Sequence, residues 1–494
     1  MNRNCGQEQI VAPDLPGLAA RLCDRYRDII DAPQRMQETL LRPLPVTLWT
    51  NTLRLRRAEL MALLHEDGLR ASPVGWNAGG LKLPADARPG RHWGFLAGLF
   101  RIQEEVSMLP VQLLDPQPGE RILDLCAAPG NKTAQIALAM QNTGTVVAND
   151  AKRGRIAAIR QTVKRLGLIN CTVTVRDGQG IDRRAGTFDR VLVDAPCTCE
   201  GTFRKVRVPR IVDADTRNRA VRLQTNLLRR AIRLTRTGGR IVYSTCTFAP
   251  EENEGVVDAM LREQGRRLRL LPARVPGFDA APGVTMWMGR SYDPRVRDCL
   301  RVWPHREDTG GFFVAVLEKV GGEVVERVPA FSASEESRNW LTPFIERLGM
   351  PDEVFRGVRL VRRGNQHIHA VPDDHVAPRA PAPELLGLPV VRRRSLPLKP
   401  TTASIVLWGH HASRNVVTLR ADQAMAYLLR QACELEQSQL TACTGPGYAV
   451  VRLRNRVIGL GQLVYSPVGA GVKLLSLVPK TWVRDGVDAV YEAD

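Results

Sequence analysis

Two cysteines each follow a predicted strand, at positions where a thiol can act as a nucleophile. Cys197 ends the segment DAPC (194–197), and Cys246 ends the segment STC (244–246). Pro196 holds the turn before Cys197 in an extended shape. A free cysteine is otherwise a small buried hydrophobic residue, whereas its thiolate is a nucleophile. Two thiols that converge on one edge of a sheet, with Asp194 beside one of them, are unusual and make these cysteines candidate nucleophiles.

The spacing of the cysteines along the chain gives little sign of a metal centre or of disulfides. The ten cysteines are scattered and include no CxxC pair, so they predict neither a zinc cluster nor a disulfide framework. Cys197 and Cys199 form a single CxC, which is weak evidence for a metal site. We therefore expect no metal ion.

Four aspartates lie at or near the ends of predicted strands: Asp124, Asp150, Asp177 and Asp194. An aspartate at the end of the second strand is well placed to accept hydrogen bonds from a ribose diol. Asp177 could similarly meet an adenine amino group. A single aspartate at such a position is more often a helix cap. Four of them in series favour a nucleoside-binding site.

The loop CAAPG (126–130) joins a short apolar strand to a helix from about residue 131 to 140. Small residues and Gly130 let the backbone approach a ligand closely. The loop lacks GxGxxG, and Lys132 is not preceded by the glycine spacing of a Walker loop. A nucleotide-like ligand without a pyrophosphate fits this loop better, and an ordinary strand–helix turn is the alternative.

Regular alternation of strands and helices from residue 120 onward must position these groups. The pattern predicts a parallel α/β sheet with its polar residues gathered at one edge. The expected parallel strands are 121–125, 145–149, 172–176, 190–193 and 240–244. The expected helices are 131–140, 153–166 and 216–234. An antiparallel strand is expected at 312–317. The helix at 216–234 carries six arginines.

The flanking regions predict further modules. Before the sheet, the pattern indicates one or two helices in 13–40, a strand at 46–49, a helix at 57–66, a strand near 80–83 and a helix in 101–114. After it, a helix near 334–348 and a strand near 358–362 precede a Pro- and Arg-rich linker at 371–400. The tail predicts a mostly β module with a helix at 421–435 and strands at 448–453 and 457–460.

Charge and hydropathy narrow the class of protein. The formal net charge is +19 over 494 residues, and the pI is about 10.0. Such an excess favours a polyanionic partner such as nucleic acid, although high genomic arginine usage could produce it too. The sequence has no long apolar run and no signal-peptide pattern in residues 1–22. We therefore expect a cytoplasmic protein without a membrane partner.

The motifs together resemble the Sun-domain (NSUN-type) RNA cytosine-5 methyltransferases. The resemblance covers about residues 101–320 and depends on the strand end at Asp150 and four motifs: DLCAAPGNKT (124–133), VDAPCTCEGTFRK (193–205), YSTCTFAPEENE (243–254) and RVWPHREDTGGFF (301–313). The tail is similar to the bacterial ribosomal RNA methyltransferase F type, whose extra modules end in a PUA-like domain. Two positions depart from the family pattern: Cys199 replaces a small non-thiol residue, and Asn131 replaces a second glycine.

The resemblance implies a class I (Rossmann-like) methyltransferase domain at 101–320 that uses S-adenosyl-L-methionine. It also implies an N-terminal α+β RNA-binding module at 1–100, a connecting domain and linker at 321–400, and a PUA-like RNA-binding domain at 401–494. The implied cofactor-binding residues are Cys126, Ala127, Ala128, Pro129, Gly130, Asn131, Lys132, Asp150, Asp177 and Asp194.

Three catalytic residues follow from the same resemblance. Cys246 is the implied nucleophile toward carbon 6 of cytosine, and Asp194 hydrogen-bonds the base. Cys197 assists removal of the carbon-5 proton and release of the adduct. A thiol of ordinary pKa is mostly protonated at neutral pH, so a nearby cation should lower the pKa of the nucleophile. Arg204 and Lys205 are the candidates for this cation.

The implied activity is 5-methylation of cytosine in structured RNA. Small-subunit ribosomal RNA, alone or in a ribosomal particle, is the favoured partner of a monomeric enzyme. Two alternatives remain: the same reaction on transfer RNA, and a non-catalytic RNA-binding or ribosome-assembly factor. The presence of both cysteines and all four aspartates argues against the non-catalytic alternative.

Overall fold

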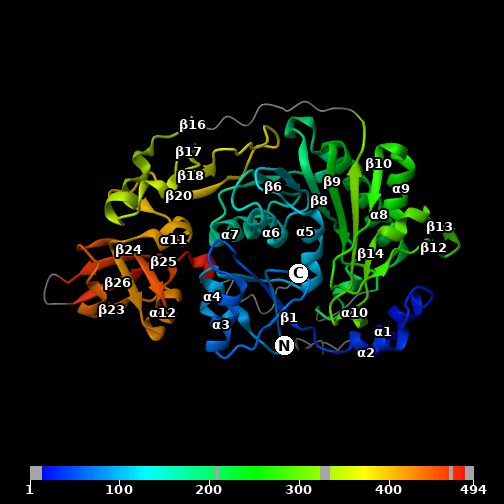
Figure 1. The fold of residues 1–494 in the computed structure, drawn as a ribbon, viewed down its shortest axis with the longest axis horizontal. Helices are drawn as coiled ribbons and strands as arrows, with labels where there is room; N and C mark the ends of the chain where they lie inside the picture. Colours follow the sequence, from blue (N-terminus) through cyan, green and yellow to red (C-terminus); the bar gives the residue numbers. More distant parts are fainter. Residues whose placement is uncertain (1–13, 206–210, 323–333, 467–470, 484–494) are drawn as a thin grey trace, which may run out of the picture.

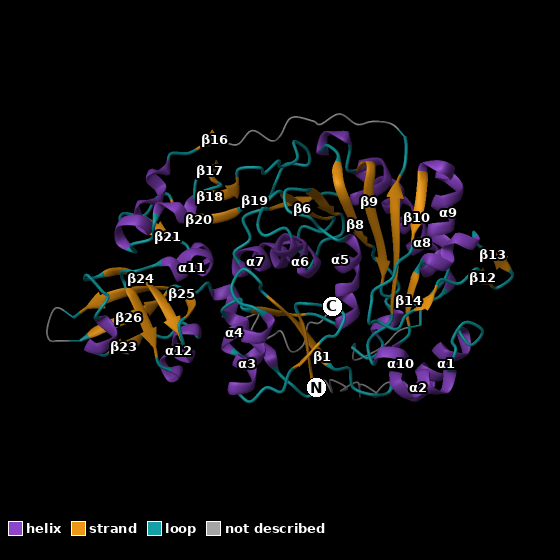
Figure 2. Cartoon of the chain, viewed as in Figure 1, coloured by secondary structure: helices purple, strands orange, loops and turns teal. Residues whose placement is uncertain are grey.

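A ten-stranded mixed sheet forms the centre of the molecule (Figures 1 and 2). The computed structural model describes residues 14–205, 211–322, 334–466 and 471–483. The strand order is β11-β14-β15-β9-β8-β5-β6-β7-β19, and β10 pairs with β15. The strands are β5 (Arg121–Asp124), β6 (Thr145–Asp150), β7 (Cys171–Val175), β8 (Phe188–Asp194), β9 (Thr235–Thr245), β10 (Leu268–Leu271), β11 (Ala281–Pro282), β14 (Leu300–Val302), β15 (Phe312–Lys319) and β19 (Leu385–Leu386).

Helices cover both faces of this sheet, as the alternation of its apolar residues requires. Successive strand residues point to opposite faces. Leu123 therefore belongs to the core under α8 (Ala214–Leu234) and α9 (Glu254–Gln264). Ile122 belongs to the core on the other face, which is covered by three helices: α5 (Leu109–Leu114), α6 (Asn131–Ala139) and α7 (Ile156–Leu166). The five strands β7, β6, β5, β8 and β9 run parallel, which confirms the predicted α/β sheet.

The N-terminal region has two parts that pack in different places. One part is an antiparallel sheet of β2 (Ser72–Pro73), β3 (Gly80–Leu83), β1 (Val46–Thr50) and β4 (Phe100–Ile102), with α3 (Arg57–Glu66) and α4 (Trp93–Leu96). The other part is the pair α1 (Leu15–Arg25) and α2 (Pro33–Leu40), which packs into the core of the central sheet. That core also receives the short hairpin of β12 (Met286–Trp287) and β13 (Arg290–Ser291) through Trp287, and α2 contacts α10 (Pro304–Glu307).

Residues 334–400 form a second sheet, so the expected linker is wrong, and the expected helix is present only as two short helical segments. The strand order is β16 (Ser334–Glu335), β17 (Val358–Arg363), β18 (His367–Pro372), β20 (Leu388–Arg392) and β21 (Lys399–Pro400). In place of one helix at 334–348 there are β16, a 3₁₀-helix (Arg338–Leu341) and a π-helix (Pro343–Arg347), because Pro343 lacks the amide hydrogen that a continuous helix needs. The expected linker instead supplies β20 and also β19, which pairs with β7 of the central sheet.

The C-terminal region is rich in β-structure, as expected. Its five strands follow the order β22 (Val416–Leu419), β24 (Gly447–Leu453), β25 (Arg456–Tyr465), β26 (Val472–Ser476) and β23 (Cys433–Leu435), with α11 (Thr402–Trp408) and α12 (Ala421–Leu428) beside them. The helix expected at 421–435 is shorter, because its last residues form β23. None of the helices in the described part of the chain is long and apolar enough to span a membrane.

A buried ion pair connects the two layers near the end of the central sheet, and we predict that it is important for stability. Arg301 of β14 donates two hydrogen bonds of 2.6 and 2.7 Å to Glu254 of α9, and both side chains are buried. Arg301→Ala leaves an unpaired buried carboxylate and should lower the free energy of unfolding by about 3–5 kcal/mol. Urea unfolding followed by circular dichroism measures this change.

The matched control is Arg269→Ala. Arg269 pairs with Glu318 across β10 and β15, but its side chain is 61% exposed. Loss of such a surface pair should cost less than about 1 kcal/mol. Equal destabilisation by the two variants would contradict the importance of the buried pair.

Candidate active site

The loops after β8 and β9 bring three thiols together. Since β8 and β9 are parallel neighbours with Asp194 opposite Ser244, the residues after each strand lie side by side. The Sγ atoms of Cys197 and Cys246 are 3.4 Å apart, and that of Cys199 is 3.9 Å from that of Cys197. The two thiols that were predicted to share one sheet edge therefore touch, and a third joins them.

Backbone hydrogen bonds hold these two loops together. The Gly201 amide donates to the Cys246 carbonyl at 2.9 Å, and the Gly311 amide donates to the Gly201 carbonyl at 2.8 Å. A Cβ atom on Gly201 would lie only 2.2 Å from the Gly311 carbonyl oxygen. Glycine is therefore required at this close approach.

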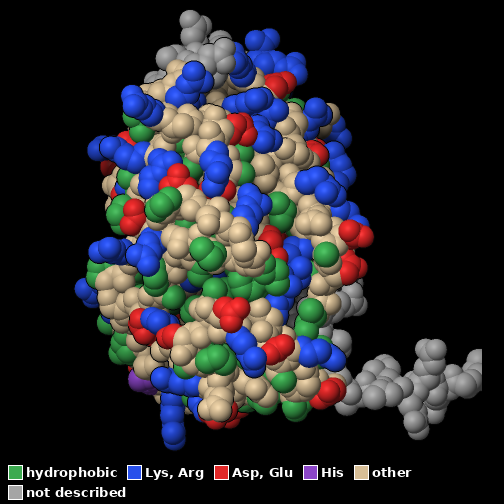
Figure 3. Space-filling view, turned by 90° about the vertical axis from the view of Figure 1, so that its right-hand side faces the viewer, with side chains coloured by type: hydrophobic (Ala, Val, Ile, Leu, Met, Phe, Trp, Pro, Cys, Tyr) green, Lys and Arg blue, Asp and Glu red, His purple; other side chains and the backbone are tan. Residues whose placement is uncertain are grey.

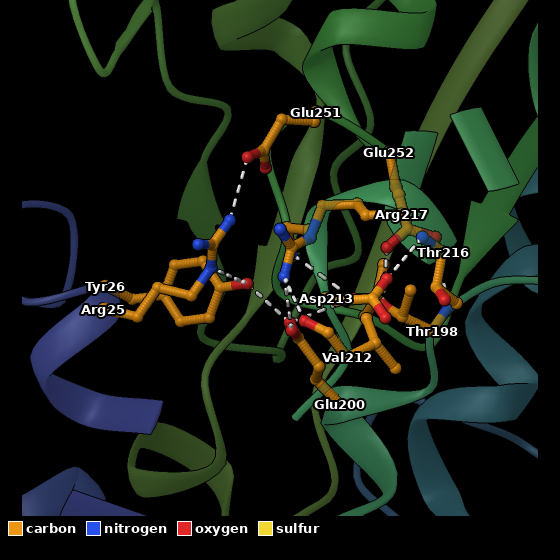
Figure 4. A network of polar contacts seen from close by, with 12 residues as sticks. Arg25, Tyr26, Thr198, Glu200, Val212, Asp213, Thr216, Arg217, Glu251 and Glu252 are labelled. Atoms are coloured by element: carbon orange, nitrogen blue, oxygen red, sulfur yellow. Dashed lines mark hydrogen bonds and ion pairs between the residues drawn. The ribbon is translucent and has the colours of Figure 1, made fainter. Parts of the chain in front are cut away.

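A fully buried carboxylate, that of Glu252, also connects the two loops (Figure 4). Thr198, between the two cysteines of the first loop, donates to Glu252 from its amide at 3.1 Å and from its hydroxyl at 2.5 Å. Gln224 of α8 donates to the same carboxylate at 2.7 Å. Burial raises the pKa of Glu252 despite these hydrogen bonds. Because Glu252 itself follows Cys246 by six residues, this side chain ties the Cys197 loop to the Cys246 loop.

A second buried carboxylate, that of Glu200, links these loops to the N-terminal helices. Tyr26, just after α1, donates its hydroxyl to Glu200 at 2.5 Å. Thr247 donates to the same oxygen at 3.1 Å, and Arg217 of α8 lies 3.7 Å from the other oxygen (Figure 4). The thiol loops are thus supported from three directions.

The carboxyl edge of the sheet borders a cavity of about 730 Å³. This volume lies in the range of small-ligand pockets. Among the predicted site residues, nine line it: Asp124, Cys126, Ala127, Ala128, Pro129, Asn131, Lys132, Asp194 and Cys246. Cys199 and Lys205 also line it, as do Arg101 of β4 and Gln103 and Glu104, which follow that strand. The remaining predicted residues, Gly130, Asp150, Asp177 and Cys197, are not part of the lining.

Asp194 forms an ion pair inside this cavity. Its Oδ2 accepts a hydrogen bond from Lys132 Nζ at 2.7 Å, and its Oδ1 accepts one from the Ser244 hydroxyl at 2.7 Å. Burial alone would lower the pKa of Lys132, but the negative charges of Asp194 and, to a smaller extent, Asp124 and Cys246 together raise that pKa above the ordinary value. The pair therefore keeps a cation beside the aspartate.

The loop at 126–130 is fastened to the ends of β5 and β6. Asp150 accepts hydrogen bonds from the Ala128 amide at 3.2 Å and from the Lys152 amide at 3.0 Å. Gly130 has a φ of +104°, and a Cβ atom there would lie 3.0 Å from Ile159 Cα. Asp124 accepts from the Thr133 hydroxyl at 2.6 Å, and burial raises its pKa to about 7.

Asp177 behaves differently from the other three aspartates. Its carboxylate is exposed and accepts a hydrogen bond from the Gln179 amide at 3.0 Å, at the start of a short 3₁₀ turn. This is the capping role that was the alternative for every strand-end aspartate. A role for Asp177 in ligand binding stays a prediction.

The thiol cluster favours one negative charge. Hydrogen bonds from Cys197 and Cys246 lower the pKa of Cys199 to about 3, and Lys205 and Arg155 assist. The pKa of Cys197 is raised by the hydrogen bonds that this thiol makes with Cys199 and with Cys246, and by its burial. The hydrogen bond from Cys197 lowers the pKa of Cys246, but the hydrogen bond with Cys199 and burial raise it by more. The net effect is a raised pKa for Cys246. Ionisation of one thiol therefore opposes ionisation of the others.

The two cations that the sequence analysis proposed near the thiols have different positions. Lys205 lines the cavity and acts on Cys199. Arg204 instead donates to the carbonyls of Arg42, Pro43 and Thr309 and pairs with Asp308 at 2.6 Å. Arg204 thus fastens the segment after α2 to the cavity rim.

Sequence reasoning missed the groups that hold the thiols in place. Glu200, Gly201, Glu252 and Gly311 all lie inside the quoted motifs, but nothing local indicated their contacts. The acidic residues of EENE (251–254), between apolar segments, were the available signal, because buried carboxylates require partners.

Comparisons with known proteins agree with this site. Residues 111–318 match the model of the family described as 16S rRNA methyltransferase RsmB/F. A tRNA (cytosine(49)-C(5))-methyltransferase of Pyrococcus abyssi is 38% identical over 302 residues, which is 60% of this chain and 96% of that protein. A ribosomal RNA small subunit methyltransferase F of Erwinia tasmaniensis is 29% identical over 466 residues, which is 90% of this chain and 91% of that protein.

Two further comparisons extend this result. A 28S rRNA (cytosine-C(5))-methyltransferase of Mus musculus is 38% identical over 332 residues, and the match covers 64% of this chain but only 41% of the mouse protein. The crystal structure of a methyltransferase homologue from Pyrococcus horikoshii has a TM-score of 0.55 at 32% identity, over 63% of this chain and 100% of that one.

Proposed function

The chain belongs to the RsmB/F family of RNA cytosine-C5 methyltransferases, and we propose that it methylates carbon 5 of cytosine in ribosomal RNA. The contact of 3.4 Å between the Cys197 and Cys246 thiols, beside a cavity that also contains Asp194, carries this proposal. Similarity to the Erwinia small-subunit enzyme over 90% of the chain favours small-subunit ribosomal RNA. The Pyrococcus abyssi relative makes transfer RNA the second candidate substrate.

S-adenosylmethionine supplies an electrophilic methyl group when bound. The residues present fit this cofactor, because the 126–130 loop and the ends of β5 and β8 offer backbone groups and carboxylates around one cavity. Oδ1 of Asp124 is buried without a hydrogen-bond partner, so it is available to a donor of the ligand. Asp150 is our candidate for the ribose hydroxyls.

Cys246 is the proposed nucleophile. Carbon 5 of cytosine is a poor nucleophile, and addition of a thiolate to carbon 6 makes it reactive. The sulfur–carbon bond forms as the carbon 5–carbon 6 π electrons move into the ring. Asp194 accepts a hydrogen bond from the exocyclic amine of the base, and the adjacent Lys132 offsets the negative charge that develops on the ring.

Cys197 is the proposed base of the second half of the reaction. After methyl transfer, a thiolate at this position takes the carbon-5 proton, and the bond between carbon 6 and Cys246 breaks to restore the aromatic ring. Its position 3.4 Å from Cys246 suits this role. The target base must leave its stack to reach both thiols.

Surface charge supports an RNA partner. Lys and Arg side chains are spread over much of the face shown in Figure 3. On α8, Arg219, Arg222 and Arg233 are exposed, whereas Arg217 and Arg229 pair with Glu200 and Glu263. Only part of this helix is therefore available for phosphate contacts.

The flanking regions complete the proposal. We assign RNA binding to the region 1–100 and a PUA-like RNA-binding role to the β-rich region 401–494; residues 1–13, 467–470 and 484–494 lie outside the described structure. We further propose that the enzyme acts as a monomer in the cytoplasm.

The two thiols can be separated by covalent trapping. With RNA and S-adenosylmethionine present, Cys197→Ala should accumulate a protein–RNA adduct, because it forms the carbon 6 bond but does not resolve it. Cys246→Ala should form no adduct and transfer no methyl group. A denaturing gel detects the adduct as a slowly migrating RNA-linked band.

The reverse pattern, with adduct in Cys246→Ala alone, would exchange the two assignments. Cys199→Ala should be tested in parallel, because its sulfur is 3.9 Å from that of Cys197 and could replace it. Transfer of a labelled methyl group by the wild type in a single turnover excludes the non-catalytic alternative. If no methyl group is transferred to any RNA tested, the non-catalytic alternative is favoured.

The substrate class can be decided in cells. Bisulfite sequencing of ribosomal and transfer RNA is compared between cells with and without the gene. One cytosine of small-subunit ribosomal RNA should be protected from bisulfite conversion only when the gene is present. Complementation with the Cys246→Ala variant should not restore this protection. Loss of protection only in transfer RNA would replace ribosomal RNA by the second candidate.

Asp150 can be tested through cofactor affinity. Asp150→Ala should weaken S-adenosylmethionine binding by about 1–3 kcal/mol, because hydrogen bonds to a partly buried diol are lost. Isothermal titration calorimetry measures the affinity, and thermal unfolding without ligand checks the fold. Asp182→Ala is the control, because Asp182 likewise accepts a hydrogen bond from the amide two residues later, whereas Asp150 also accepts one from the Ala128 amide of the 126–130 loop. Unchanged affinity in Asp150→Ala would remove Asp150 from the site.

A further inference from the structure

The thiol cluster contains one more sulfur than the proposed reaction uses. The Sγ atoms of Cys197, Cys199 and Cys246 all lie within 4.8 Å of one another. Within the described ranges, no other group of three or more His, Cys, Asp or Glu side chains brings its ligand atoms this close. Cys199 has no role in the steps assigned to Cys197 and Cys246, so its presence calls for another explanation.

The spacing of the sulfurs matches that of a metal–thiolate site. Because zinc–sulfur bonds are about 2.3 Å long, thiolates in a tetrahedral arrangement are about 3.8 Å apart. The two shortest contacts here, 3.4 and 3.9 Å, lie on either side of that value. Small side-chain rotations would therefore suffice to ligate one ion.

The loops hold this arrangement before any ion binds. Thr198, between two of the cysteines, is fixed by Glu252, and the carbonyl of Cys246 accepts the Gly201 amide at 2.9 Å. Cys199 is held at a φ of 60°, with its sulfur 3.3 Å from the Cys197 carbonyl oxygen. Such preorganisation lowers the cost of assembling a ligand set.

The charges around the cluster suit a complex of three thiolates. A divalent cation with three thiolates carries one net negative charge, which the nearby Lys205 and Arg155 would stabilise. Thiolate ligands select soft or borderline cations over magnesium and calcium. Cys199 and Cys246 face the cavity, so a fourth coordination position remains open to water.

The geometry points to a binding site for a thiophilic divalent cation of the zinc class, formed by Cys197, Cys199 and Cys246. On binding, three sulfur–metal bonds form as the Cys199 thiolate coordinates the ion and the Cys197 and Cys246 thiols release their protons to solvent, and no electron is transferred. Taken with the proposed function, occupancy blocks methyl transfer reversibly, because both reacting thiols become ligands. Cys199 thereby makes the active site sensitive to such metals.

Zinc binding by the full chain, without RNA or cofactor, tests this site independently of the methyltransferase proposal. The metal-free protein, kept reduced with a non-thiol reagent, is titrated with zinc chloride against a chromophoric chelator. We expect one tight site per chain and a weakening of at least about 100-fold in Cys199→Ser, which removes one of three ligands. Cadmium titration should give ultraviolet thiolate-to-metal charge-transfer absorption that Cys199→Ser loses.

Cys443→Ser is the matched control, because Cys443 is a half-buried free thiol in the C-terminal region and is not part of the cluster. It should bind zinc as the wild type does. Cys199→Gly is a second variant that suits the left-handed backbone, and thermal unfolding verifies that both Cys199 variants fold. Absence of a tight site in the wild type, or unchanged affinity in a folded Cys199 variant, would overturn the inference. Failure of the adduct test with normal zinc binding would affect only the proposed function.

Discussion

The contact between the loops that follow β8 and β9 is the constraint on which the active site depends. Two thiols from separate motifs can act on one base only if their sulfurs remain within a few ångströms of each other. The parallel register of the strands brings the loops together, and Glu252 and Gly201 then hold them there. Both groups are buried and have specific partners, so the site is rigid before a ligand binds.

This rigidity extends beyond the central domain because buried polar groups need partners from several directions. Glu200 receives Tyr26 from the N-terminal helices, and Arg204 fastens the following segment to the cavity rim. The β1–β4 sheet shares a hydrophobic core with the C-terminal β-rich region, so these two parts, far apart in the sequence, pack against one another. The flanking regions are therefore packed parts of one fold, not loosely tethered appendages.

The close approach of three thiols also limits their chemistry. Negative charge on one sulfur disfavours charge on its neighbours, so the cluster favours one thiolate at a time unless a cation intervenes. A reaction that uses one thiolate first and another later suits this limit. A divalent metal ion removes the limit by compensating the charge of all three thiolates.

The sequence alone determined the alternating strands and helices of the central sheet and the positions of Cys197, Cys246 and the CAAPG loop. Apolar periodicity, glycine and proline act through the local backbone, so their effects can be predicted without distant partners. Tertiary packing decided the rest. The linker expected at 371–400 is ordered because β7 and β18 offer it edges to pair with, and the helix expected at 334–348 is interrupted at Pro343, which separates two short helical segments. Cys199 joins a cluster only because Cys246, 47 residues later, reaches the same place through the register of β8 and β9.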